Sequence, residues 1–513
     1  MNASSQQAST QNKPEFGKFQ SIFWPVHKFE LKKFIPMSIL MFCILFVQAM
    51  LRSLKDVLII KCAVCGETEL ISQLKLCFVM PAAFLIVMLY SFLINEFGFK
   101  KTFYTITLGL TAFYAIFLFF LLPNSNVIHA NEEQIASMRA TLPGAFYYII
   151  PCITNWSYTL FYVFAELWST VMLQSLFWQF ANYITMENEV KRFYLLYPVL
   201  GYVGTLASGA SLKVMSRASN DQFLTNVQTL VGICVALGLL ACVMFWYINN
   251  VVLKDPRLFD KSKVKPRKKK EKMGLTDGIR LLIKSKYLLL IALISIAYGI
   301  CVNFSEVIWK EQMSLCFTNS GSYASMQANL DMTLAILNII ISIVGTNLLR
   351  KFKWKTVALI TPIALITLSS IFFSLVVYGK FISPTLLGIN VAYFSVWFGL
   401  IQDALSKCCK YTFFDVTKNM AYIPLDYETK TKGQAAVEVV GSRIGKASSS
   451  AVQVLLVNFI SVGSKLMSHL FTIIPILGFT FIGWILSVTK LNKKYEEKLE
   501  DFHAKQNAGS SIA

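Results

Sequence analysis

Long apolar stretches separated by short polar breaks dominate the hydrophobic pattern of this chain. A stretch of 18 or more apolar residues is long enough for an α-helix to cross about 30 Å of hydrocarbon. The fourth stretch is too long for one straight crossing, so we expect it to tilt, to break near Glu166 or to extend beyond the bilayer. The pattern predicts membrane-spanning helices near residues 35–60, 70–95, 102–122, 145–185, 194–215, 226–249, 287–310, 326–349, 355–378, 384–407, 434–460 and 467–489.

A basic polar segment separates the first six predicted helices from the last six. It holds ten Lys and Arg but only three acids between Lys254 and Lys272, which is typical of a solvated connection. About 12 helices in two six-helix halves indicate an all-α polytopic membrane protein of the major-facilitator type. The predicted division is a cytoplasmic N-terminal tail 1–33, an N-terminal half 34–250, a basic linker 251–285, a C-terminal half 286–490 and a cytoplasmic C-terminal tail 491–513.

Composition agrees with a membrane protein and excludes a nucleic-acid partner. The chain is 55% hydrophobic and 15% charged, whereas soluble proteins carry about 25% charged residues. Its net charge of +20 comes from Lys and Arg beside the ends of predicted helices, such as Lys100, Lys101, Lys191 and Arg192. This placement follows the positive-inside rule, and no nucleic-acid-binding module accompanies it. We therefore expect a multi-pass protein of the cell inner membrane with both termini cytoplasmic.

Charged side chains inside the predicted spans are the strongest functional signal. Glu166 lies among aromatic and aliphatic residues, and a lipid-facing helix should avoid such a charge. Snorkelling explains charges near helix ends, and mutual ion pairing is the other structural explanation. The cations outnumber the anions, and a cavity with surplus Lys and Arg attracts phosphates. The charged positions are Arg52, Lys55, Asp56, Lys75, Glu166, Glu306, Lys310, Asp403, Arg443 and Lys446.

The sequence gives no support for catalysis or for a metal site. Gly441–Ser448 reads GSRIGKAS and is similar to a phosphate-binding loop, but three residues separate its glycines instead of four. It also falls in a predicted membrane helix rather than after a strand. Cys62 and Cys65 form a lone CxxC without the further ligands that zinc requires, and a disulfide between them stays open. We expect no catalytic residues, no metal and no cofactor.

Several motifs carry a resemblance to a known family over nearly the whole chain. They include WPVHKFELKKFIPM from Trp24, FAELWSTVML from Phe164, AYGICVNFSEVIWK from Ala297 and GQAAVEVVGSRIGK from Gly433. With these motifs the chain resembles the ATP/ADP translocase (nucleotide transporter) family of obligate intracellular bacteria and plastids. The resemblance implies a major-facilitator-like fold. It also implies that the protein imports or exchanges nucleotides, typically host ATP for bacterial ADP, which is energy parasitism.

The resemblance also implies which residues serve transport. Lys75, Glu166, Glu306 and Lys446 match the functionally sensitive charges of the family and are the expected substrate-binding and transport residues. A second set of residues falls in the same motifs and is assigned less directly: Lys55, Lys310 and Arg443.

Departures from the family pattern keep the substrate open. Gln48, Ala49 and Ser53 stand where an Asn, a Tyr and an Asp are usual. The family that the chain resembles includes members that take other nucleotides, or that import them with protons rather than by exchange. The alternatives to ATP/ADP antiport are thus a proton-coupled symporter for GTP, UTP, CTP or NAD, a membrane enzyme acting on nucleotides, and a passive channel. We expect a monomer in the lipid bilayer with a nucleotide substrate.

Overall fold

The computed structural model describes residues 26–185, 187–217, 220–255, 257–259, 280, 284–425, 433, 437 and 442–510. Most of the predicted basic linker lies outside these residues. The elements up to residue 254 are α2 (Leu31–Val57), η1 (Leu58–Cys62), α3 (Leu70–Gln73), η2 (Leu74–Val79), α4 (Met80–Ile116), η3 (Phe117–Leu121), α5 (Ser125–Ile128), α6 (Glu132–Thr141), η4 (Gly144–Phe146), α7 (Ile149–Thr154), α8 (Trp156–Trp168), η5 (Ser169–Phe177), α9 (Trp178–Ile184), α10 (Glu187–Met215), α11 (Asn220–Asn250) and η6 (Val252–Lys254).

The elements after residue 285 are again helices, with one very short hairpin. The segments η1, η2, η3, η5, η8 and η10 are π-helical turns, in which the helix is locally wider than an α-helix. The bounds are α13 (Lys286–Cys316), α14 (Ser320–Lys351), α15 (Trp354–Phe381), β1 (Thr385–Leu386), β2 (Ile389–Asn390), α16 (Val391–Cys409), η8 (Lys410–Phe414), α17 (Asp415–Met420), α19 (Ser442–Leu455), η10 (Leu456–Ile460), η11 (Leu466–His469) and α20 (Leu470–Ser510).

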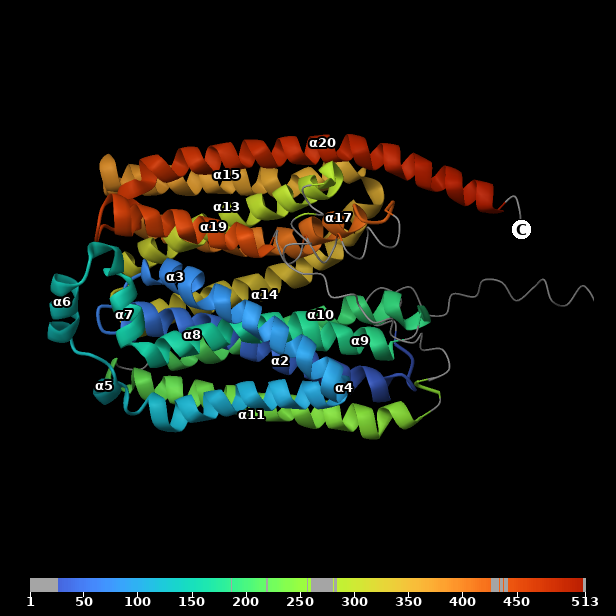
Figure 1. Ribbon diagram of the computed structural model, residues 1–513, viewed down its shortest axis with the longest axis horizontal. Helices are drawn as coiled ribbons and strands as arrows, with labels where there is room; N and C mark the ends of the chain where they lie inside the picture. The colour runs from blue at the N-terminus through green and yellow to red at the C-terminus, as the bar shows by residue number, and fades with distance from the viewer. Residues whose placement is uncertain are drawn as a thin grey trace, which may run out of the picture.

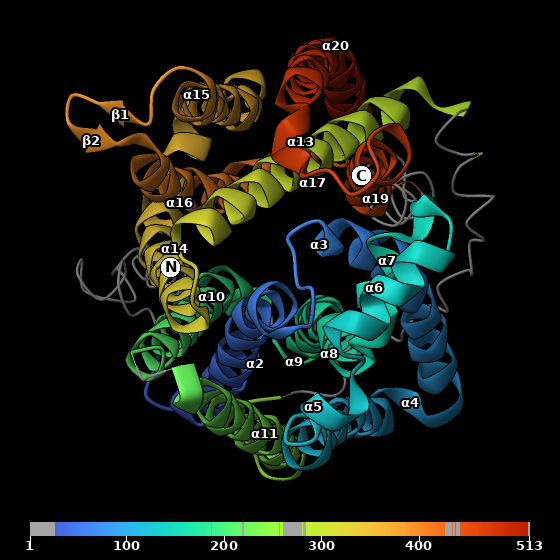
Figure 2. The same ribbon diagram turned by 90° about the vertical axis from the view of Figure 1, so that its left-hand side faces the viewer.

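The all-α polytopic class expected from the sequence is confirmed. Eight helical segments of the described chain are long and apolar enough to cross a membrane. Helices α10 and α19 run alongside them (Figure 1), and α16 packs against α13, α14 and α15 (Figure 2). The segment Leu70–Leu121 has 52 residues, too many for one crossing. It bends at Gly98, whose φ of 72° is a left-handed conformation that glycine adopts without strain, and so forms two legs. Large apolar side chains face outwards, such as Phe479 at 77% exposure, and supply a lipid-facing surface.

Three predicted boundaries differ from the structure. The fourth apolar stretch breaks at Asn155, before α8, because the Asn155 side chain pairs with both backbone groups of Val64 at 3.0 Å. The tenth stretch begins later than predicted, since residues 385–390 form a hairpin around Leu387 and Gly388, both at positive φ. The last helix continues through the predicted C-terminal tail to Ser510.

The helices form two groups that face each other. Figure 2 shows α2–α11 on one side, called the first half below, and α13–α20 on the other, called the second half. In the first half α2 packs against α10 and α11, and in the second α13 packs against α19 and α20. Helices α10 and α14 pack against each other across the two halves.

The two ends of the bundle are distinct. Helix α2 begins and α20 ends at one end, called the terminal end (Figure 1, right). The opposite end, called the loop end, carries α5, α6 and α7 together with residues 461–469. At the loop end the halves are joined by polar contacts. Tyr148 donates to the Ser464 carbonyl at 2.8 Å, Asn458 donates to the Ala145 carbonyl at 3.0 Å, and Lys61 donates to the Ser314 carbonyl at 2.9 Å. The halves are therefore closed against each other at the loop end.

Ion pairs at the terminal end join helices within the first half. Lys33 Nζ lies 2.6 Å from Glu189 and donates to the Leu258 carbonyl at 3.0 Å, and Arg192 makes a two-pronged contact with Glu30. These pairs tie the start of α2 to the start of α10. They hold the first half together as one body without linking it to the second half.

The glycine-rich stretch similar to a phosphate loop has a packing role. Residues 442–455 are helical, and Gly445 lies against Gly299 of α13. A Cβ atom at Gly445 would come within 2.7 Å of the Ile296 carbonyl oxygen, and one at Gly299 would come within 3.0 Å of Gly445. The two glycines let α13 and α19 approach closely, as small residues do in membrane helix pairs. The stretch is a helix crossing, not a phosphate-binding loop.

This crossing gives a stability prediction. Changing Gly445 to Ala is expected to destabilise the protein by about 1–3 kcal/mol, since an inserted methyl group must push two backbones apart. Gly483→Ala is the matched control, because nothing lies within 4 Å of a Cβ at that position in α20. Thermal unfolding of both detergent-solubilised variants measures the effect. Equal unfolding midpoints for the two variants would contradict the close crossing.

Candidate transport site

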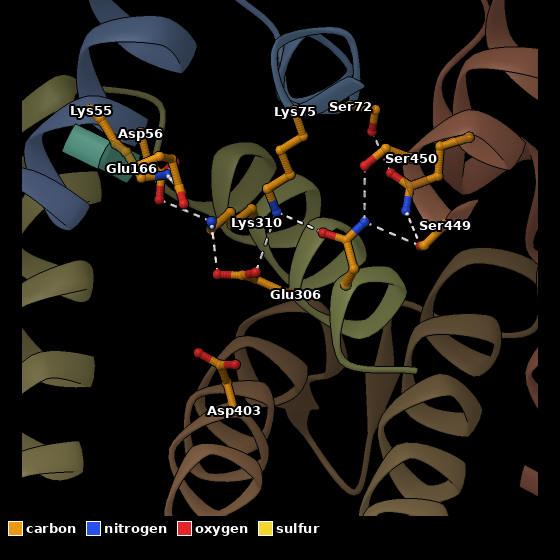
Figure 3. A network of polar contacts seen from close by, with 12 residues as sticks. Lys55, Asp56, Ser72, Lys75, Glu166, Glu306, Lys310, Asp403, Ser449 and Ser450 are labelled. Atoms are coloured by element: carbon orange, nitrogen blue, oxygen red, sulfur yellow. Dashed lines mark hydrogen bonds and ion pairs between the residues drawn. The ribbon is translucent and has the colours of Figure 1, made fainter. Parts of the chain in front are cut away.

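A cluster of charged side chains lies between the halves, and Figure 3 shows seven of its members: Lys55, Asp56, Lys75, Glu166, Glu306, Lys310 and Asp403. Lys55 and Asp56 come from the last turns of α2, and Glu166 comes from α8. Lys75 belongs to the π-helical turn η2, and another π-helical turn, η5, begins three residues after Glu166. Such turns reorient side chains and are frequent at functional sites.

Within the first half, Lys55 contacts both carboxylates of the cluster. Its Nζ lies 3.0 Å from Asp56 and 3.2 Å from Glu166. The same ammonium group stands 3.8 Å from the centre of the Tyr162 ring, which favours a cation over its face. Lys55 and Asp56 are buried, whereas the Glu166 side chain is 28% exposed. The accessible partner in this trio is therefore Glu166.

Two ion pairs cross from one half to the other. Lys310 Nζ lies 2.9 Å from Asp56 of the first half and 3.1 Å from Glu306 of its own helix. Lys75 Nζ lies 3.5 Å from Glu306 and donates to Asn303 Oδ1 at 2.6 Å. The structure thus brings together Asp56 and five of the seven expected transport residues, namely Lys55, Lys75, Glu166, Glu306 and Lys310. Two of their contacts hold the halves against each other.

Lys407 was not selected from the sequence, and Asp403 was selected only as a charge inside a predicted span, without an assigned role. Lys407 Nζ in α16 lies 3.6 Å from Glu306 and 2.7 Å from Asp403. The sequence did contain a signal for this pair: an acid and a base four residues apart in an apolar helix lie on the same helix face. What the sequence did not reveal is that this face meets Glu306.

Polar side chains fix Asn303 beside the charges. Its amide nitrogen donates to Ser449 at 3.1 Å and to Ser450 at 3.2 Å, both in α19. Ser449 also accepts a hydrogen bond from Gln453 at 3.1 Å, and Gln453 in turn bonds Ser72 of the first half. Lys75 is therefore held by a chain of hydrogen bonds as well as by Glu306.

A separate pair crosses the halves nearby. Arg52 contacts Asp331 of α14, and Ser53 donates to the other oxygen of Asp331 at 2.6 Å. Asp331 is fully buried, and removing a buried charge from water is costly unless it is paired and hydrogen-bonded. Ser53, one of the departures from the family pattern, supplies part of that pairing.

Lys446 differs from the other lysines. Its side chain is exposed on α19, which packs against α3 and η2, and it forms no ion pair with any residue in the described ranges. Because η2 carries Lys75, Lys446 lies on a helix that packs beside the cluster. The side chain of Arg443 lies outside what the structure describes, so its expected place in the site remains a prediction.

The cluster has a small surplus of positive charge. Lys55, Lys75, Lys310 and Lys407 are matched by Asp56, Glu166, Glu306 and Asp403, and Lys446 adds one further cation. Buried charges in a membrane protein persist when they are paired and when they serve a solute path. The arrangement can bind an anion that competes with the carboxylates for the lysines.

The described residues contain no cluster of side chains suited to binding a metal ion. No group of three or more His, Cys, Asp or Glu side chains in that part of the chain is placed to hold an ion. Cys62 and Cys65 are free thiols here, and Cys62 lies 3.8 Å from the Ser320 hydroxyl.

Two helical halves with paired charges buried between them are the architecture of a membrane transporter. Solved structures agree on the fold. The nucleoside transporter NupG superposes with a TM-score of 0.54 at 14% identity, covering 91% of this chain and all of that one. A D-xylose–proton symporter gives 0.51 at 13% identity, covering 90% and 97%. The expected major-facilitator-like architecture is confirmed.

The chain belongs to the TLC ATP/ADP transporter family, whose family model matches residues 9–495. Among its relatives, ADP,ATP carrier protein 1 of Chlamydia pneumoniae is 38% identical over 95% of both chains. ADP,ATP carrier protein 3 of Rickettsia bellii is 36% identical over 94% of this chain and 98% of that one. The family resemblance drawn from the motifs is confirmed, and the protein is a transporter rather than an enzyme.

Proposed function

We propose that this protein exchanges ATP for ADP by alternating access, with the nucleotide phosphates bound by the lysines between the halves. The observation that carries the proposal is the pair of contacts Lys75–Glu306 and Lys310–Asp56, which join the halves through groups that phosphate can displace. The names of the relatives, which are ADP,ATP carriers, supply the substrate class.

The residues have distinct proposed roles. Lys75 and Lys446 hold the phosphates, since ammonium groups bind phosphate as point charges. Glu166 and Glu306 neutralise lysines in the empty site and give them up when phosphate arrives. Lys55 and Lys310 keep these carboxylates in place, and Arg443 of α19 is proposed to add a second phosphate contact.

The exchange of carboxylate for phosphate as the partner of the lysines makes nucleotide exchange obligatory. To reorient while empty, the protein must break Lys75–Glu306, which is partly buried, and Lys310–Asp56, which is fully buried. Separating charges that are removed from water is costly unless new partners replace the old ones. A bound polyphosphate replaces the carboxylates as the partner of the lysines, so that the halves separate at lower cost. The loaded site therefore changes orientation faster than the empty site, and net flux requires a nucleotide on each side.

The terminal end is proposed to face the cytoplasm of the cell whose inner membrane holds the protein. Basic residues gather at that end, as the positive-inside rule requires. With the loop end closed, the exposed Lys446 is then accessible from the cytoplasmic side. The transporter is proposed to act as a monomer, because each chain contains both halves of the site.

Uptake into proteoliposomes tests the proposal. Labelled ATP is expected to enter only when the vesicles contain ATP or ADP, and a protonophore should leave the rate unchanged. Uptake that stops when the protonophore is added would favour proton-coupled symport over exchange. A preference for GTP, UTP, CTP or NAD would favour a different nucleotide substrate. Chemical conversion of the label would support an enzyme, and non-saturable flux would support a channel.

A further inference from the structure

Two buried carboxylates lie near each other at the loop end, outside the transport site. Glu69, which precedes α3 in the first half, accepts the Leu466 N–H at 3.0 Å. Glu311, on α13 of the second half, accepts the next N–H along the chain, that of Met467, also at 3.0 Å. Because consecutive Cα atoms lie about 3.8 Å apart, the two carboxylates are neighbours. The Glu69 contact also joins the halves.

The surroundings leave this pair short of positive charge. Glu69 and Glu311 are 2% and 3% exposed. Lys465 contacts Glu67 and forms a longer ion pair with Glu69 Oε2, at 3.8 Å, which is beyond hydrogen-bonding distance. Lys380 donates to the Met467 carbonyl instead of to a carboxylate. The titratable and charged groups around the pair are Lys61, Glu67, Tyr148, Cys152, Lys310, Lys380, Lys465 and His469.

One oxygen of the pair has no hydrogen bond. Glu69 Oε2 is buried and has no hydrogen-bond partner among the described residues, although its other oxygen is used by Leu466. An ionised carboxylate oxygen buried without a donor is costly, whereas a protonated one is not. Burial raises the pKa of the Glu69 carboxyl above its ordinary value and outweighs the opposing effects of Lys465 and the Leu466 N–H.

We propose that the Glu69–Glu311 pair is a proton-binding site that takes up one proton when the loop end closes and releases it when the loop end opens. Two neighbouring carboxyl groups that are removed from water hold one proton between them, since ionising both is costly. Opening breaks the Glu69–Leu466 contact, admits water and lets both groups ionise. The site rests on the proposed alternation of the halves but requires neither of the transport-site glutamates.

The sign of the pH dependence follows from this difference. The Glu69 carboxyl binds a proton more tightly in the closed form, so closure is favoured at low pH. The preference weakens as the pH rises from the ordinary carboxyl pKa, about 4.3, to the higher value of the closed form. Above that value closure no longer depends on pH. Acidification on the loop-end side therefore holds the transporter closed on that side.

The two sites share helices, so protonation at one reaches the other. Glu311 follows Lys310 directly on α13, and Glu69 precedes Lys75 by six residues through α3 and η2. When the loop end opens, the same rigid segments move Lys310 away from Asp56 and Lys75 away from Glu306. Proton binding is thus expected to alter the rate of nucleotide exchange as well as the conformation.

Distance measurements between spin labels test the proton site. Labels carried by an unnatural amino acid at Ser137 and Thr385, both exposed at the loop end, leave the eleven native cysteines in place. In lipid nanodiscs between pH 8 and pH 5, we expect the ratio of molecules with a short label separation (loop end closed) to molecules with a long one (loop end open) to rise as the pH falls. With one proton linked to closure, the ratio changes by up to about tenfold per pH unit.

Isosteric variants identify the groups responsible. Glu69→Gln keeps an acceptor for the Leu466 N–H and is expected to stay closed at every pH, with Glu311→Gln as the second variant. Glu132→Gln is the control, because Glu132 is an exposed acid of α6 at the loop end, and it should keep the wild-type pH dependence. A wild-type ratio independent of pH, or a wild-type slope in both Glu69→Gln and Glu311→Gln, would overturn the proposal.

The same measurement distinguishes failure of the proton-site proposal from failure of the proposed ATP/ADP exchange. The distances are recorded without nucleotide, and ATP/ADP exchange is assayed independently in proteoliposomes. Exchange that proceeds beside a pH-independent distance ratio rejects the proton site alone. A Glu69-dependent titration in a protein that carries no ATP or ADP rejects the proposed substrate alone.

Discussion

Reversing the charge of Lys446 or of Lys75 is expected to reduce nucleotide exchange at least about 100-fold. Loss of a hydrogen bond to a charged group costs roughly 1.5–3 kcal/mol, and an added carboxylate also repels the phosphates. Lys446→Glu and Lys75→Glu are measured by uptake of labelled ATP into vesicles loaded with ADP. Lys353→Glu is the control, because Lys353 is an exposed lysine just before α15 and far in sequence from the site residues.

The two lysines should differ in their effect on stability. Lys446 is exposed and has no ion-pair partner among the described residues, so Lys446→Glu is expected to change the free energy of unfolding by less than about 0.5 kcal/mol. Lys75 is bound by Glu306 and Asn303, so Lys75→Glu should destabilise the protein as well. Lys446→Arg should restore part of the transport. Normal exchange by Lys446→Glu in correctly inserted protein would remove Lys446 from the site.

Neutralising Glu306 is expected to stabilise nucleotide binding while it abolishes turnover. Glu306 contacts Lys75, Lys310 and Lys407, and its loss leaves three lysines with fewer partners. Removing one partner of a fully buried ion pair costs about 3–5 kcal/mol, and the cost here is smaller because the Glu306 side chain is 17% exposed. Bound ATP supplies the missing negative charge, so the rise in thermal midpoint on adding ATP should be larger in Glu306→Gln than in the wild type. The tightly held nucleotide is then released slowly.

Thermal unfolding with and without ATP, together with the exchange rate, checks this second prediction. Asp415→Asn is the control, since Asp415 is partly exposed and its contacts with Lys410 and Lys418 are 3.8 and 3.5 Å long. Exposed pairs of this kind contribute about 0–1 kcal/mol. If Glu306→Gln loses both stability and the response to ATP, Glu306 acts as a structural group rather than as a competitor of phosphate.

Part of the site was accessible from sequence because charges inside apolar helices are conspicuous. Glu166 and Glu306 stand out from the apolar residues around them, and the spacing of Lys310 from Glu306 places both on one helix face. Lys407 and Asp403 carry the same kind of signal. Their contact with Glu306 depends on how α16 packs against α13, which no local pattern records.

Other features follow from residues far apart in the chain. Glu69 and Glu311 are unremarkable acids near predicted helix ends, and each alone would be read as solvated. They become a pair because two consecutive N–H groups in the segment after α19 bind them, that of Leu466 binding Glu69 and that of Met467 binding Glu311. The near-match to a phosphate loop was rightly rejected from its spacing, but its helix-packing role required the position of Gly299.

The sequence by itself determined that this protein is a polytopic helical transporter, which family it belongs to, and which charges are too costly to face lipid. These properties depend on the length of apolar stretches and on the residues of local motifs, and both can be read along one chain. Only the tertiary structure decided which lysine meets which carboxylate, that the loop end is closed, and that Lys446 is left without a partner among the described residues. Ion pairs and their desolvation depend on distances of a few ångströms between helices, and sequence order does not fix those distances.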